Sequence, residues 1–103
     1  MSMDYGAFDT ALKAAAGDNT ALAEELRSDF VESANRQISL LSRSRCDANW
    51  QYAALRLKGL AASFGAGAVI ELSDEALEGA PGDPVVVRKL EASIAEIAQH
   101  PLA

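Results

Sequence analysis

The chain has 103 residues, half of them apolar, which is enough for a single domain spanning residues 1–103 with one hydrophobic core. Its formal net charge of −6 argues against a nucleic acid as partner, and its single cysteine excludes an internal disulfide bond. No apolar run is long enough to span a bilayer, and the first residues lack the apolar region of a signal peptide. We therefore expect a cytoplasmic protein without a membrane partner.

The first two expected helices follow from apolar residues repeated every three or four positions. A short helix is predicted over 4–16, with Gly17 placed to end it. A long helix is predicted from Ala21 to about Ser42, because neither glycine nor proline interrupts that pattern. Its apolar stripe comprises Leu22, Leu26, Phe30, Ala34, Ile38 and Leu41. Its N-cap candidates are residues 18–20.

Three further helices are predicted after turn or capping residues. The third covers about 48–64 with Asp47 as its N-cap, and the fourth begins after Gly67. The fifth begins at Pro84 with Asp83 as its N-cap. Because short connections make neighbouring helices antiparallel, the sequence predicts an all-α fold. The expected architecture is an antiparallel up-down four-helix bundle with an additional short N-terminal helix.

The third helix carries two different faces. Its predicted inward stripe comprises Ala54, Leu57, Ala61 and Phe64. At about 100° per residue, Leu55 projects almost opposite this stripe, and Gly59 lies one turn later on the same outer face. A glycine inside a helix costs about 1 kcal/mol relative to alanine. An exposed leucine beside such a glycine indicates a surface shaped for close approach by another molecule.

Positive charge gathers in the same part of the chain. Residues 33–70 hold five basic residues and one acidic residue, a net charge of +4, whereas the segments on either side are each net negative. This pattern indicates a local patch for an acidic partner. We define the docking face as the predicted partner-binding residues of the third helix: Tyr52, Leu55, Arg56, Lys58, Gly59, Ala62 and Ser63.

The segment Ala54-Leu55-Arg56-Leu57-Lys58-Gly59, with Gly65 six residues later, resembles the core motif of histidine phosphotransfer (HPt) domains. That motif reads roughly Ala-His-x-Leu-Lys-Gly, followed by small residues and a further glycine. The resemblance extends over about residues 20–98. It implies a helical bundle of two-component phosphorelay signalling. It also implies that Lys58 helps to bind a phosphoryl group and that Gly59 leaves room for a receiver domain.

The chain departs from the family at the phosphoacceptor position, where Leu55 replaces the histidine. A leucine has no nucleophile for an aspartyl phosphate. The resemblance therefore implies a non-phosphorylatable binding or regulatory module, which docks a response-regulator receiver or a histidine kinase. One alternative is an ordinary relay protein whose histidine was replaced by leucine. Another is a structural bundle that self-associates through the Leu55–Gly59 face, although we expect a monomer.

No other pattern predicts chemistry. Cys46 has no histidine or cysteine near it in sequence, and His100 matches nothing in the HPt motif. The acidic pairs, Glu24-Glu25 and Asp74-Glu75, are typical of solvated helix faces. No Glu-x-x-His metal motif, P-loop or Rossmann motif is present. We therefore expect no enzymatic activity, no metal and no cofactor.

Overall fold

The structure, a computed structural model, describes residues 5–102. Within this range every regular element is a helix, which confirms the predicted all-α class. The helices are α1 (Gly6–Ala16), α2 (Thr20–Arg43), α3 (Asp47–Ser63), α4 (Gly67–Glu78) and α5 (Pro84–Gln99). None of the helices in this described part combines the length and the apolar character needed to cross a bilayer.

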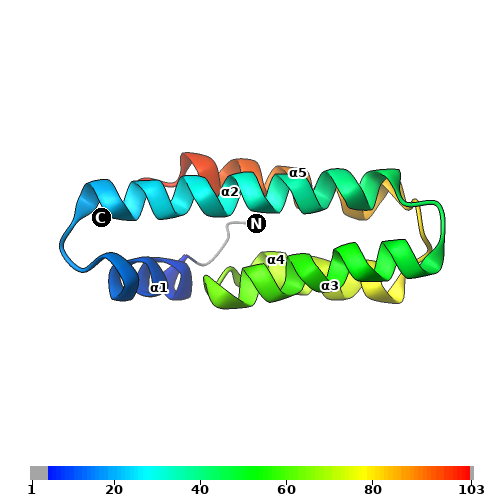
Figure 1. Cartoon of the computed structure of the whole chain (residues 1–103), viewed down its shortest axis with the longest axis horizontal. Coiled ribbons are helices and arrows are strands. Elements are labelled where there is room, and N and C mark those ends of the chain that lie inside the picture. The colour runs from blue at the N-terminus through cyan, green and yellow to red at the C-terminus, as the bar shows by residue number, and fades with distance from the viewer. Residues whose placement is uncertain (1–4, 103) are drawn as a thin grey trace.

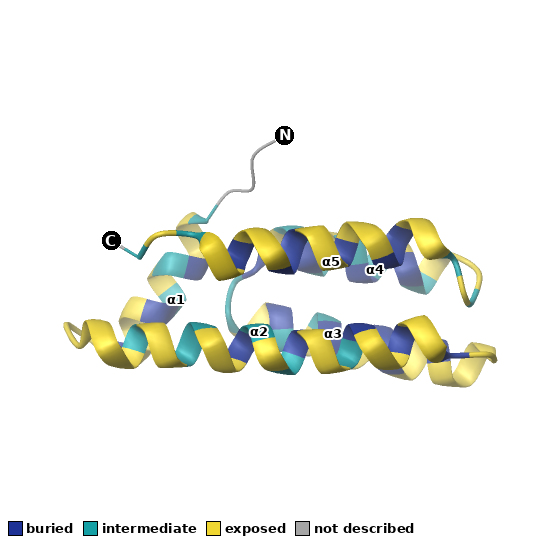
Figure 2. Ribbon diagram, turned by 90° about the horizontal axis from the view of Figure 1, so that it is seen from above, coloured by how far each residue is buried: buried dark blue, intermediate teal, exposed yellow. Residues whose placement is uncertain are grey.

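Four of the helices pack around a common core. In Figure 1, α2 and α3 lie at the front, with α5 behind α2 and α4 behind α3. Each packs against two neighbours, in the pairs α2–α3, α3–α4, α4–α5 and α2–α5. Figure 2 shows that the buried residues, in dark blue, lie mainly on the sides of the helices that face one another. The largest fully buried residues of these four helices are Trp50, Phe30, Leu41, Leu57, Leu90, Ile94, Ile97, Val69 and Val86.

Two helices, α2 and α5, begin directly after residues that the sequence predicts as N-caps. The Asn19 side chain accepts a hydrogen bond from the backbone N–H of Leu22 at 3.0 Å, within the predicted cap segment of α2. The Asp83 carboxylate accepts one from Val85 at 2.9 Å, and Pro84 stands at the first helical position of α5.

The predicted N-cap of α3 is wrong by one residue. Cys46 occupies the cap with extended backbone, and no side chain accepts a capping hydrogen bond there. Asp47 is instead the first residue of α3, where its negative charge favours the positive end of the helix dipole.

The first helix fills a space left by the unequal lengths of α2 and α3. From 24 and 17 residues, α2 is about 36 Å long and α3 about 26 Å. α1 lies alongside the N-terminal part of α2, beyond the end of α3 (Figure 1). There the Phe8 ring packs against the Phe30 ring, with 5.7 Å between centroids. Leu22, in the first turn of α2, remains partly exposed despite its place in the predicted stripe.

Gly65 allows α1 to approach the end of α3 closely. Its φ is +66°, and a Cβ atom there would lie 2.7 Å from the Ala7 carbonyl oxygen. Any larger residue would both strain this backbone and push α1 away. The glycine that ends the HPt-like motif therefore has a packing role within this chain.

Candidate docking face

The docking face lies on the outer side of α3. Leu55 is 56% exposed and Tyr52 is 60% exposed, among the most exposed large apolar side chains of the described chain. By contrast, the inward residues Ala54, Leu57 and Ala61 are fully buried. Lys58 is half-buried, and the other members of the docking face are all exposed. The helical period thus separates the two faces as the spacing predicts.

Trp50 fixes the rotation of α3 against α4. Its ring is buried, and the indole Nε1–H donates a hydrogen bond to the Ala76 carbonyl oxygen at 2.6 Å. Rotation of α3 about its axis would break this bond and would draw a large aromatic side chain out of the core. The anchor therefore keeps Leu55 turned toward solvent.

Gly59 has no packing role within the described chain. Apart from its own turn of α3, a Cβ atom at this position would meet no heavy atom of the described residues within 4 Å. Its backbone is helical, and its carbonyl oxygen accepts a hydrogen bond from the Ser63 hydroxyl at 3.1 Å. The open space above Gly59 lies on the surface, one turn from Leu55. Gly59 therefore lowers the stability of α3 relative to alanine, although no contact within the described chain requires a glycine there.

Tyr52 and Arg56 form an ordered pair on this surface. The guanidinium donates a hydrogen bond to the Tyr52 hydroxyl at 2.9 Å, and its central carbon lies 5.5 Å from the ring centroid. A cation near the face of an aromatic ring is attracted by the ring quadrupole. The Arg56 charge remains exposed and is not neutralised by this uncharged partner.

Lys58 is already engaged by α4. Its ammonium lies 2.7 Å from an Asp74 carboxylate oxygen, and the two side chains are 41% and 47% exposed. In the same basic segment, Arg36 pairs with Glu32 at 2.9 Å. The net charge of residues 33–70 therefore overstates the positive potential, because acidic residues outside the segment neutralise two of its cations. No pattern in the sequence predicts Asp74 as a neighbour of Lys58, since periodicity within one helix does not report contacts between helices.

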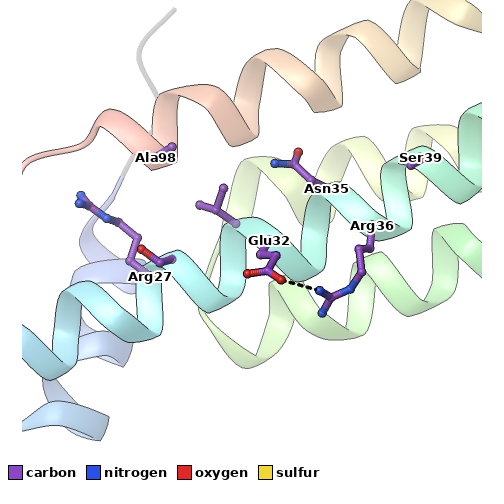
Figure 3. A pocket seen from close by; sticks show the side chains of 8 residues that line it. Arg27, Glu32, Asn35, Arg36, Ser39 and Ala98 are labelled. Carbon is purple, nitrogen blue, oxygen red and sulfur yellow. Dashed lines mark hydrogen bonds and ion pairs between the residues drawn. The ribbon is translucent and has the colours of Figure 1, made fainter.

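A groove of about 550 Å³ lies elsewhere, between α2 and α5 (Figure 3). Its lining residues are Arg27, Ser28, Val31, Glu32, Asn35, Arg36, Ser39 and Ala98. It contains no residue of the docking face. Glu32 and Arg36 are occupied with each other, and Arg27 donates a hydrogen bond to the His100 carbonyl oxygen. The groove offers no pairing of a nucleophile with a base.

Cys46 and His100, the other two side chains considered in the sequence, lie outside the docking face. Cys46 is exposed at the start of α3. The His100 ring stacks on the Tyr5 ring with 3.7 Å between centroids, and its Nε2 lies 3.0 Å from an Asp9 carboxylate oxygen. His100 therefore joins the end of α5 to the start of α1. No group of three His, Cys, Asp or Glu side chains in residues 5–102 is arranged to hold a metal ion.

Comparison of the chain with protein-family models, with curated proteins and with solved structures gave no match.

Proposed function

We propose that this chain is an HPt-like docking module of two-component signalling that binds a receiver domain or a histidine kinase without accepting phosphate. On this proposal the helices α2–α5 form the antiparallel up-down bundle of that family, with α1 as an addition. The partner covers the docking face, and Leu55 is at its centre. The proposal implies a cytoplasmic protein.

Gly59 is the observation that carries the proposal. A glycine inside a helix lowers stability, and nothing in the described chain fills the space where its Cβ would lie. A partner whose surface approaches the helix closely at this point accounts for the glycine. The exposed side chains of Leu55 and Tyr52, on the same helix face, then supply apolar contact area around it.

The chemistry of the face supports binding without transfer. A phosphoryl group needs a nucleophilic atom, and the Leu55 side chain consists of carbon and hydrogen only. Arg56 retains an exposed positive charge, which favours an acidic pocket on the partner. The face therefore keeps the contacts that binding needs and lacks the atom that transfer needs.

Titration of the ¹⁵N-labelled chain with the receiver domains of its source organism tests the proposal. We expect at least one receiver to shift amide resonances of residues 52–63, and a phosphorylated receiver to transfer no phosphate to the chain. Phosphate transfer, or binding that shifts only residues of other helices, would overturn the proposal. Histidine kinase domains from the same organism are tested in the same way.

A further inference from the structure

The ion pair between Lys58 and Asp74 lies beside Leu55. Lys58 follows Leu55 by three residues, so the two side chains are neighbours on the surface of α3. A helical side chain leans toward the N-terminus of its helix, which directs Lys58 back toward the turn that holds Leu55. The hydrogen bond of Trp50 to Ala76 and the ion pair of Lys58 with Asp74 place this part of α4 next to that turn.

The Asp74 carboxylate therefore lies against the ammonium of Lys58, which is part of the docking face. The Lys58–Asp74 distance of 2.7 Å is that of a direct charge-assisted hydrogen bond. A phosphoryl group on residue 55 would carry a charge of about −1.5 to −2, by analogy with other phosphorylated side chains. Asp74 would both repel that group and compete with it for Lys58.

We infer that Asp74 is a specificity-determining residue that bars phosphate from position 55, in addition to the loss of the histidine. This inference rests on the proposed function of the face. It predicts that Leu55→His alone restores phosphate acceptance poorly, and that removal of the Asp74 charge restores it further. On this inference, the chain needs two changes to accept phosphate, one at Leu55 on α3 and one at Asp74 on α4.

A small phosphodonor tests the inference without any partner protein. With phosphoramidate, an imidazole nitrogen of the introduced histidine forms a new bond to phosphorus while the bond from phosphorus to the amino nitrogen breaks. Ammonia leaves with the electron pair of that bond and takes up the proton that the phosphorylated imidazole ring releases, so the step needs neither oxidant nor reductant. Intact-protein mass and ³¹P NMR measure the rate of phosphohistidine formation.

The matched set comprises Leu55→His alone and the same variant combined with Asp74→Asn or with Glu75→Gln. Glu75 is the control because it is an acid on the same helix that pairs with Lys89 of α5, at 3.3 Å, and not with α3. We expect Asp74→Asn to raise the rate about fivefold, the size of one nearby charge interaction in water. Glu75→Gln should leave the rate unchanged.

Equal rates for Leu55→His with and without Asp74→Asn would overturn the inference, as would an equal gain from Glu75→Gln. Adding Lys58→Ala to the Leu55→His/Asp74→Asn variant should reduce the gain, because only the repulsion by Asp74 is then relieved. An undiminished gain would contradict the role given to Lys58. Failure of the proposed function is seen separately, as absence of receiver or kinase binding by the unmodified chain.

Discussion

Two glycines near the end of α3 have opposite relations to the fold. Gly59 is helical with open space around the position of a Cβ, whereas Gly65 has a positive φ and faces the Ala7 carbonyl oxygen. We predict that Gly59→Ala raises the free energy of unfolding by about 1 kcal/mol, because alanine is the better helix former and meets no neighbour. Urea denaturation followed by circular dichroism measures the change.

Gly65→Ala is the matched contrast for this prediction. The added methyl group meets Ala7 at 2.7 Å and the backbone is left-handed, so stability should fall by more than about 1 kcal/mol. A Gly59→Ala variant that loses stability would show that the helix at this point needs glycine for its own packing. That result would remove the main support for a docking role.

Tyr5 links stability to alkaline pH. Burial raises the pKa of its hydroxyl above the usual 10, and the negative charges of Glu96 and Asp9 raise it further. The unfolded chain therefore loses this proton at a lower pH than the folded chain does, so stability falls as the pH rises above about 10. We predict that Tyr5→Phe reduces the loss of unfolding free energy between pH 9 and pH 11.

Denaturation of the unmodified chain and of Tyr5→Phe, each at pH 9 and at pH 11, measures this difference. Tyr52→Phe is the control, because Tyr52 is exposed on α3 and lies outside the contact between α1 and α5. An equal pH dependence for Tyr5→Phe and the unmodified chain would contradict the assignment.

At the scale of elements, the His100 side chain links the start of α1 to the end of α5. His100 stacks on Tyr5 and lies within hydrogen-bonding distance of Asp9, so it bridges the two helices. We predict that His100→Ala speeds amide hydrogen exchange in α1 at least about tenfold, since each lost 1.4 kcal/mol corresponds to a factor of ten. Exchange in α3 and α4 should remain unchanged.

Gln99→Ala provides the control for this prediction, because Gln99 is an exposed neighbour of His100. Faster exchange spread evenly over all helices would instead indicate global destabilisation. Unchanged exchange in α1 would show that the packing of Phe8 against Phe30 suffices to hold it.

The sequence predicts most of what happens within a helix and little of what happens between helices. The exposure of Leu55 and the burial of Leu57 follow from a 100° turn per residue, and the Asp83 cap follows from the proline after it. The Lys58–Asp74 pair depends on how α3 and α4 pack, which periodicity does not specify. The prediction of Asp47 as N-cap was wrong because α3 begins at Asp47 itself, which leaves Cys46 at the N-cap without a side-chain capping hydrogen bond.

At the scale of the whole molecule, the docking face is small and carries charge at its edge. Leu55 and Tyr52 are its large apolar side chains, and Arg56 adds an exposed cation next to Tyr52. Two copies that met face to face would bring like charges together, which disfavours self-association. We predict a monomer at 100 µM by sedimentation velocity. A dimer that Leu55→Asp dissociates would favour the self-associating structural bundle instead.

On the proposed function, the Leu55 side of α3 is the surface that binds a partner. The most direct test compares Leu55→Asp with Val85→Asp in a calorimetric titration against the receiver or kinase domain that the unmodified chain binds. Val85 is the matched control, since it is an apolar side chain on α5 that is 47% exposed. We predict that Leu55→Asp weakens binding at least about tenfold, as a hot-spot substitution does, and that Val85→Asp leaves the affinity unchanged. Equal affinity for the unmodified chain and Leu55→Asp would contradict the account.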